Sequence, residues 1–281
     1  MQEEILSNAN FRKLRSLVYQ ESGICLNDDK KTMLELRVKR RLRGLNLNST
    51  SEYCDYLFGE GGKAGELVHF LDVVTTNKTD FFRERRHFEF LAETVLPELE
   101  ARWHDRREVV VWSAGCSTGE EPYTLAMVMS EFAEKHPGFR FRVLGTDLST
   151  EVLAKAEQGI YSAEVIHPIP QPLRTKYLMR GRENHSSLVR IVPELRRHVQ
   201  FRRLNFMAEH YGIAEKVDAV FCRNVIIYFD RSTQEQILQK ITRHVTPGGY
   251  AFVGHSETLH GMNVPLQPIA PALYRRTDGS T

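Results

Sequence analysis

The stretch that most resembles a ligand-binding loop is 113–123, with the sequence Ser-Ala-Gly-Cys-Ser-Thr-Gly-Glu-Glu-Pro-Tyr. It follows an apolar β-branched run and precedes an amphipathic one, so it should join a strand to a helix, where small residues let a ligand reach the backbone amides. It carries neither the P-loop pattern nor the Gly-x-Gly-x-x-Gly dinucleotide pattern. Glu120 and Glu121 would repel a pyrophosphate, which favours S-adenosylmethionine over NAD. An ordinary tight turn is the alternative interpretation.

The second candidate site residue, Asp147, ends the next strand-like run, 141–147. A carboxylate at the end of a parallel strand can accept hydrogen bonds from both ribose hydroxyls of an adenosine. Asp147 lies 28 residues after Gly119, against about 20 in the dinucleotide pattern. The alternative interpretation is a cap on the following helix, for which Ser149 competes.

Polar side chains also follow a third apolar run, within 221–230 (Phe-Cys-Arg-Asn-Val-Ile-Ile-Tyr-Phe-Asp). Ligands of open α/β sheets bind beyond the carboxyl ends of the strands, which places Arg223 and Asn224 at such a site. Methyltransferases that act on nucleic acids or amino groups often have Asn/Asp-Pro-Pro-Tyr here, but this segment has no proline, and Tyr228 is one place too far along. A strand end with Asp230 as a helix cap would explain only part of the pattern.

The segment 75–84 (Thr-Thr-Asn-Lys-Thr-Asp-Phe-Phe-Arg-Glu) joins two parts of different character. Junctions between domains are favoured ligand locations. Asn77, Thr79 and Arg83 are therefore candidate site residues, or else cap and solvated helix residues.

A basic run lies between Lys30 and Arg43, with seven basic residues and one acid. It is either a solvated helix face or a surface for an acidic partner, because guanidinium groups pair well with carboxylates.

The elements that would position these residues predict an α/β protein with a helical N-terminal domain. Residues 1–76 contain only helical patterns, including 11–18, a helix capped at 27–29, and two short helices around the glycines at 59–62. From 77 to 281, strand-like runs alternate with helical ones, which predicts a doubly wound, Rossmann-like sheet. About 160–204 interrupts the alternation and is interpreted as an inserted β-subdomain.

Composition narrows the classes of protein. The chain has 281 residues and a net charge of +2, so it lacks the basic field typical of nucleic-acid-binding proteins, although a local basic patch stays open. The start has no signal-peptide pattern, and no apolar run approaches the roughly 20 residues of a bilayer span. The four cysteines match no zinc or disulfide spacing. We therefore expect a cytoplasmic protein without a metal.

Taken together, the chain resembles the chemotaxis receptor methyltransferases, the CheR family. The resemblance covers nearly the whole chain and is carried by Thr-Asn-x-Thr-x-Phe-Phe-Arg-Glu at 76–84, Trp-Ser-Ala through Ser-Thr-Gly-Glu-Glu-Pro-Tyr at 112–123, the segment 221–230, and Gly-His-Ser-Glu at 254–257.

The resemblance implies a helical receptor-contacting domain (1–76) and an S-adenosylmethionine-binding methyltransferase domain (77–281). It also implies methyl transfer to glutamate side chains in the cytoplasmic helical region of chemoreceptors, by a monomer. It places the following residues at the cofactor: Asn77, Thr79, Arg83, Glu121, Asp147, Asn205, Phe206, Arg223 and Asn224. It ties Arg83 and Tyr228 to catalysis, and it assigns receptor contact to Arg37, Arg40, Arg41 and Arg43.

In some members the β-subdomain binds a pentapeptide at the receptor C-terminus through a Gly-rich turn. Here the corresponding turn, 180–185, has one glycine, which argues against that contact.

Other classes remain as alternatives. An NAD-dependent oxidoreductase is opposed by the missing fingerprint. An RNA methyltransferase is opposed by the absent Asn-Pro-Pro-Tyr and the near-zero net charge, and a non-catalytic adaptor that binds S-adenosylmethionine stays open.

Overall fold

The computed structural model describes residues 5–102, 108–181 and 187–277. Its N-terminal part is helical, as expected, and packs around one apolar cluster that includes Leu14, Leu34 and Phe70. Ser7 caps the first helix and Gly23 ends it at φ 73°. The elements are α1 (Asn8–Ser22), the 3₁₀ turn η1 (Asp28–Lys30), α2 (Lys31–Leu45), α3 (Thr50–Phe58) and α4 (Glu60–Val74).

Two local predictions in this part are wrong. The Asn27 side chain makes no capping hydrogen bond, and a 3₁₀ turn precedes α2 instead. The glycines after Gly59 do not form a turn between helices, because α4 already begins at Glu60. At Gly62 an added Cβ would lie 2.0 Å from the Tyr56 carbonyl oxygen, so glycine is what lets α4 approach α3 this closely.

The second part is built on a seven-stranded sheet in the order β6-β2-β1-β7-β8-β10-β9. The pairs from β6 to β8 are parallel, and β10 pairs antiparallel with both of its neighbours. This arrangement confirms the predicted doubly wound α/β class. The strands are β1 (Val109–Ala114), β2 (Phe141–Asp147), β6 (Val199–Arg203), β7 (Val217–Cys222), β8 (Val245–Val253), β9 (Leu266–Ala270) and β10 (Leu273–Arg276).

Helices cover both faces of this sheet, so every residue of β1 and β7 is buried. One face packs on the segment α5–η2–α6 and on α7, and the other packs on α11. The helices are α5 (Arg86–Phe90), the π-helix η2 (Leu91–Val95), α6 (Leu96–Arg102), α7 (Glu120–Lys135), α8 (Thr150–Gln158), the 3₁₀ turn η4 (Ile226–Tyr228) and α11 (Arg231–His244).

A separate small antiparallel sheet, β3-β5-β4, confirms the predicted β-containing insertion. Val199–Arg203 was expected to lie within this insertion, but it pairs with β2 and is the edge strand of the main sheet. Residues 182–185 of the turn that corresponds to the peptide-binding turn of some family members lie outside the described residues. The insertion contains β3 (Ile160–Ser162), α9 (Gln171–Tyr177), β4 (Leu178–Arg180), β5 (Leu188–Ile191) and α10 (Pro193–Arg196).

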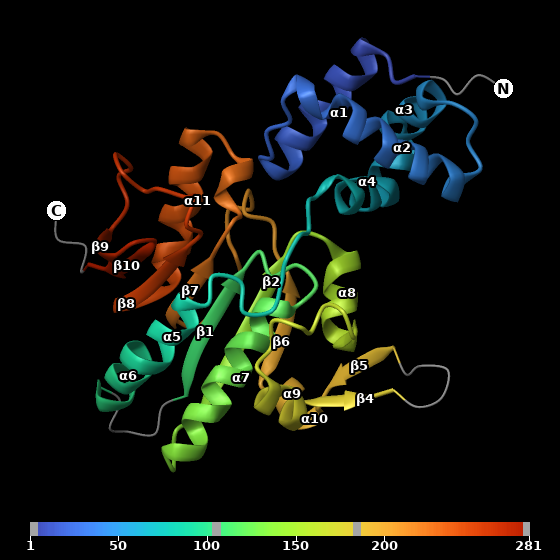
Figure 1. Ribbon diagram of the computed structural model, residues 1–281. Helices are drawn as coiled ribbons and strands as arrows, with labels where there is room; N and C mark the ends of the chain where they lie inside the picture. The colour runs from blue at the N-terminus through green and yellow to red at the C-terminus, as the bar shows by residue number, and fades with distance from the viewer. Residues whose placement is uncertain (1–4, 103–107, 182–186, 278–281) are drawn as a thin grey trace.

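The helical part sits over the carboxyl ends of the parallel strands (Figure 1). On one side, the Asp72 carboxylate of α4 accepts hydrogen bonds from the amide and hydroxyl of Thr150 at 2.8 and 2.7 Å. On the other, the Tyr19 hydroxyl donates to Asp230 at 2.8 Å. None of the helices in the described ranges has the length and apolar character that a membrane crossing requires.

Candidate active site

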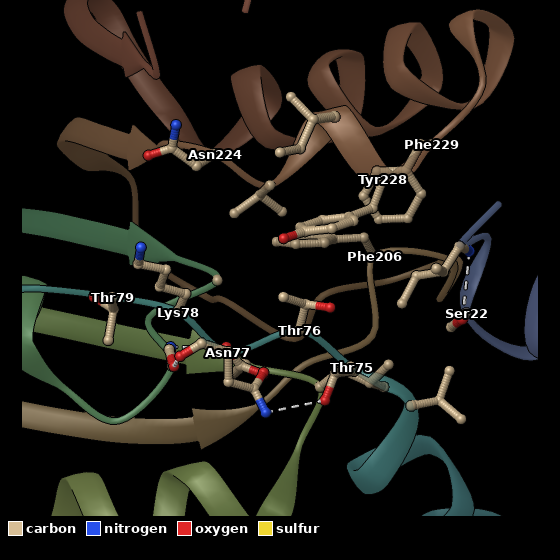
Figure 2. A pocket seen from close by; sticks show the side chains of 18 of the residues that line it. Ser22, Thr75, Thr76, Asn77, Lys78, Thr79, Phe206, Asn224, Tyr228 and Phe229 are labelled. Carbon is tan, nitrogen blue, oxygen red and sulfur yellow. Dashed lines mark hydrogen bonds between the residues drawn. The ribbon is translucent and has the colours of Figure 1, made fainter. Parts of the chain in front are cut away.

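A cavity of about 300 Å³ lies between the carboxyl ends of β1, β2 and β7 and the helical part. On the side of the helical part, the cavity is lined by Ile24 and Leu26, which follow α1, and by Met33 of α2. The structure brings all the predicted cofactor and catalytic residues to this one cavity, and Figure 2 labels five of them, Asn77, Thr79, Phe206, Asn224 and Tyr228. The full set is Asn77, Thr79, Arg83, Glu121, Asp147, Asn205, Phe206, Arg223, Asn224 and Tyr228.

The loop after β1 reaches the cavity through backbone turns that favour small residues. Gly115 has φ 85°, and a Cβ on it would lie 2.5 Å from Cγ2 of Val225 across the cavity wall. Ser117 has φ 50°, and its hydroxyl donates to the Asn77 carbonyl at 2.8 Å. The loop is thereby tied to the segment that enters from the helical part.

Asp147 lies at the end of β2, as predicted. One carboxylate oxygen accepts from the Ser117 amide at 2.8 Å and the other from the Ser149 amide at 3.0 Å. Burial raises the pKa of this carboxyl, although the backbone hydrogen bonds oppose the shift. Each oxygen keeps acceptor capacity, so the two can also accept the hydroxyls of a ribose.

Glu121 and Arg223 form a buried ion pair at the base of the cavity. The Arg223 Nε donates to Glu121 at 2.7 Å, and the Ser113 hydroxyl donates to the other Glu121 oxygen at 2.6 Å. A further Arg223 nitrogen donates to the Arg83 carbonyl at 2.6 Å. The guanidinium stacks over Phe88 at 5.0 Å from the ring centre. Arg223 thus connects β7, α7 and the loop of Arg83.

Behind Arg223, the ligand atoms of Glu84, His87 and His255 lie within 4.8 Å of one another, close enough to hold a metal ion. The Arg223 Nη1 is 3.4 Å from Glu84 and 3.3 Å from Nδ1 of His87, so a fixed cation already occupies their ligand side. Burial, followed by repulsion from Arg223, lowers the pKa of His87 to about 4. We assign no metal to this cluster.

The turn after β7 is held by Glu257, which was not among the predicted site residues. Its carboxylate accepts from the amides of residues 224, 225 and 226 at 2.8, 2.9 and 2.9 Å and from that of Gly254 at 2.5 Å. Asn224 is held at φ 58°. Its amide oxygen is buried and has no hydrogen-bond partner among the described residues. A ligand with a donor group would satisfy this oxygen. The only sequence hint was the position of Glu257 in the 254–257 motif.

The two residues predicted to act in catalysis reach the cavity from different elements. Arg83 is half-buried, and its guanidinium donates to the Lys78 carbonyl at 3.1 Å. Tyr228 ends η4, its carbonyl accepts from the Cys25 amide at 2.8 Å, and its hydroxyl points into the cavity (Figure 2). Lys78, which the prediction left out, lines the same cavity.

Asn205 and Phe206 close the cavity on the side of α1. The Asn205 amide donates to the Glu21 carbonyl at 2.6 Å and accepts from the Met207 amide at 2.9 Å. Phe206 presents a largely buried apolar ring. The Asn205 side chain therefore helps to join the helical part to the sheet, and Phe206 supplies a flat apolar wall.

The predicted receptor-contacting arginines divide into two pairs. Arg41 makes a bidentate pair with buried Glu66 at 2.8 and 2.7 Å. Arg37 donates to the carbonyls of residues 74 and 75 at the end of α4. Arg40 and Arg43 are exposed on α2. The first two are thus engaged within the chain, and the second two face outward.

Several features together fit S-adenosylmethionine: a parallel sheet, a cavity beyond its strand ends, an acid after β2, and an unsatisfied amide oxygen. Comparison with known proteins agrees with this assignment. The family described as "CheR methyltransferase, SAM binding domain" matches residues 77–272. The chain is therefore an S-adenosylmethionine-dependent methyltransferase.

The family "CheR methyltransferase, all-alpha domain" matches residues 9–75. The chain belongs to the CheR methyltransferase family. A chemotaxis protein methyltransferase of Escherichia coli K12 is 43% identical over 90% of this chain and 85% of the relative. One of Borreliella burgdorferi is 37% identical over 94% and 93%. Chemotaxis protein methyltransferase 2 of Pseudomonas aeruginosa is 38% identical over 97% and 95%.

Proposed function

We propose that the chain transfers a methyl group from S-adenosylmethionine to glutamate side chains in the cytoplasmic helical region of chemoreceptors. The products are glutamate methyl esters and S-adenosylhomocysteine. Membership of the CheR family supports a chemotaxis role, and the single structural observation that carries the proposal is the gathering of ten predicted residues around one cavity.

The lining suits the cofactor part by part. Asp147 binds the ribose hydroxyls, Phe206 covers an apolar face, and the unpartnered oxygen of Asn224 accepts a donor group. Asn77, Thr79 and Arg83 close the cavity from the first residues of the second domain, 77–281, directly after the helical domain, 1–76. The bound cofactor supplies a methyl group activated by a sulfonium charge.

The acceptor needs no general base. A glutamate side chain has a pKa of about 4.3, so it is almost fully ionised at pH 7. The chain's task is to align the carboxylate with the methyl group and to exclude water, a contribution that reaches about 7–11 kcal/mol in favourable cases. Arg83 holds a carboxylate at the site, and Tyr228 fixes the direction of approach.

Turnover of two variants tests these roles. Arg83→Ala and Tyr228→Phe should each lose most of their turnover, and calorimetry with S-adenosylhomocysteine separates this loss from a loss of cofactor binding, which we expect to stay intact in Tyr228→Phe. Activity is measured as base-labile tritium on a receptor fragment, because carboxyl methyl esters release methanol in alkali and N-methyl groups do not. Near-normal turnover with intact binding would defeat the assigned roles. A wild-type protein without affinity for S-adenosylhomocysteine would defeat the function itself.

Receptor docking involves the outward face of α2. Arg40 and Arg43 are exposed there, and guanidinium groups pair with carboxylates of an acidic helical partner. Arg37 and Arg41 support this face through their contacts inside the chain. The protein acts as a cytoplasmic monomer.

A second receptor contact, between the receptor C-terminus and the β-subdomain, is known in some family members. Titration with a receptor C-terminal peptide tests this contact, and we expect no binding.

A further inference from the structure

Lys78 lies in the cavity wall, and none of the roles described above uses its side chain. The carbonyl of the preceding residue, Asn77, accepts from the Ser117 hydroxyl at 2.8 Å. The carbonyl of Lys78 itself accepts from Arg83 at 3.1 Å. The backbone is therefore held on both sides of the Cα atom, while the side chain is exposed and lines the cavity.

The charge of Lys78 has no counterpart. In the parts of the chain that the structure describes, no ion pair or hydrogen bond engages its ammonium group. The other lining lysine, Lys30, is paired with Asp29 at 3.0 Å, and Arg223 is paired with Glu121. Within the described ranges, the Arg83 guanidinium hydrogen-bonds to the Lys78 carbonyl and to no carboxylate. The lining thus presents two cations, Lys78 and Arg83, without carboxylate partners.

Two further polar groups face the same space. The Asn224 amide oxygen lacks a partner among the described residues. The Tyr228 hydroxyl extends into the cavity from the opposite element, and the ammonium of Lys78 extends into it from the entering segment (Figure 2). A carboxylate can accept from the ammonium and from the hydroxyl, whereas the Asn224 oxygen is itself an acceptor and is left for a donor group of the cofactor.

We infer that Lys78 is a specificity-determining residue, which selects an ionised glutamate over a neutral glutamine and releases the ester. This inference rests on the proposed function. In the transfer, a carboxylate oxygen forms a bond to the methyl carbon, and the sulfur–methyl bond breaks with its electron pair moving to sulfur. No proton moves. The ester has lost the charge that Lys78 attracts, so the same residue that favours substrate binding does not retain the product.

The test compares binding of receptor fragments that carry glutamate or glutamine at the methylated positions. Saturating S-adenosylhomocysteine is present, so no turnover occurs. The wild type should bind the glutamate form about five-fold more tightly, the scale of one partly exposed ion pair. Lys78→Met should lower this ratio toward one, with any remaining preference left to Arg83, and Lys78→Arg should keep it. Lys135→Met is the matched control, because Lys135 is exposed at the far end of α7.

Three results would overturn the inference. They are equal wild-type affinity for both fragments, an unchanged ratio of the two affinities in Lys78→Met, and evidence that Lys78 binds the cofactor instead of the substrate. The last is detected by weaker binding of S-adenosylhomocysteine to Lys78→Met with unchanged binding of methylthioadenosine, which lacks the amino acid part. Failure of the proposed function gives a different result. The wild type would then bind neither S-adenosylhomocysteine nor methylthioadenosine, or it would make no alkali-labile ester.

Discussion

Two buried groups beside the site, Glu120 and His87, should give the protein opposing pH dependences. Glu120 begins α7 and accepts from the Thr118 hydroxyl at 2.7 Å. Burial raises the pKa of Glu120 to about 7, and Asp80 adds to the shift. Burial lowers the pKa of His87 to about 4. Both side chains are at least 95% buried, so their titration affects the stability of the fold.

The direction of each pH dependence is set by whether the folded or the unfolded state binds the proton more tightly. For Glu120 it is the folded state, so its contribution is fully present below pH 4.5 and is lost as the pH rises through about 7. For His87 it is the unfolded state, so its contribution is present above pH 6.5 and is lost as the pH falls through about 4. Each shift corresponds to about 3 kcal/mol. Between pH 4.5 and 6.5 the two contributions to the free energy of unfolding change with pH in opposite directions, and these changes nearly cancel.

Glu120→Gln separates them, because it keeps the shape and an acceptor for Thr118 but removes the titration. Relative to wild type, the variant should gain up to about 3 kcal/mol at pH 8 and almost nothing at pH 4.5. Urea unfolding across this range measures the difference, and the wild type under the same conditions is the control. A difference that stays constant from pH 4.5 to 8 would refute the reasoning.

Three more substitutions test the packing of the site and of the helical part. Gly115→Ala should lower stability by about 1–2 kcal/mol and weaken S-adenosylhomocysteine binding in calorimetry, because of its positive φ and the contact with Val225; unchanged affinity would contradict this. Glu257→Gln should cost about 2–3 kcal/mol in urea unfolding, since an amide nitrogen cannot accept from the backbone amides; a neutral effect would show that the turn holds itself. Arg41→Met should cost about 2 kcal/mol by leaving Glu66 unpaired, and adding Glu66→Gln should restore part of the loss; a double variant as unstable as the single one would show that burial of the Glu66 charge is not the cause.

The sequence predicted the central strands well because their patterns are local. The runs that became β1, β2 and β7 are mostly apolar and are bounded by polar or glycine-containing segments; β1 and β7 are fully buried, and β2 is buried except at Arg142 and Asp147. The edge strand β6 was assigned to the wrong sheet. Val199–Arg203 alternates apolar and polar residues, which suits either sheet, and only its pairing with β2 decides between them.

The residues that line the site were predicted from residue type and family likeness. The hydrogen bonds and ion pairs that hold the surrounding turns and helices were not. Nothing local indicates that Glu257 would accept four backbone amides, since these come from turns brought together by the fold. Likewise, the family resemblance predicted a receptor contact for Arg41, but Glu66, which neutralises its charge, lies in another helix. Ion pairs of this kind depend on packing between helices, and a single sequence does not show that packing.

The cavity is surrounded by strained turns, and this links its structure to its function. Ser117 and Asn224 have positive φ without being glycine, a conformation that costs about 1 kcal/mol or more at each position. Asp147 binds the first amide and Glu257 the second. Asp147 is thus both a candidate cofactor ligand and the support of a strained turn. An alanine variant of Asp147 would remove both roles at once. Asp147→Asn, which keeps one acceptor for a backbone amide, therefore separates a loss of cofactor affinity from a loss of fold.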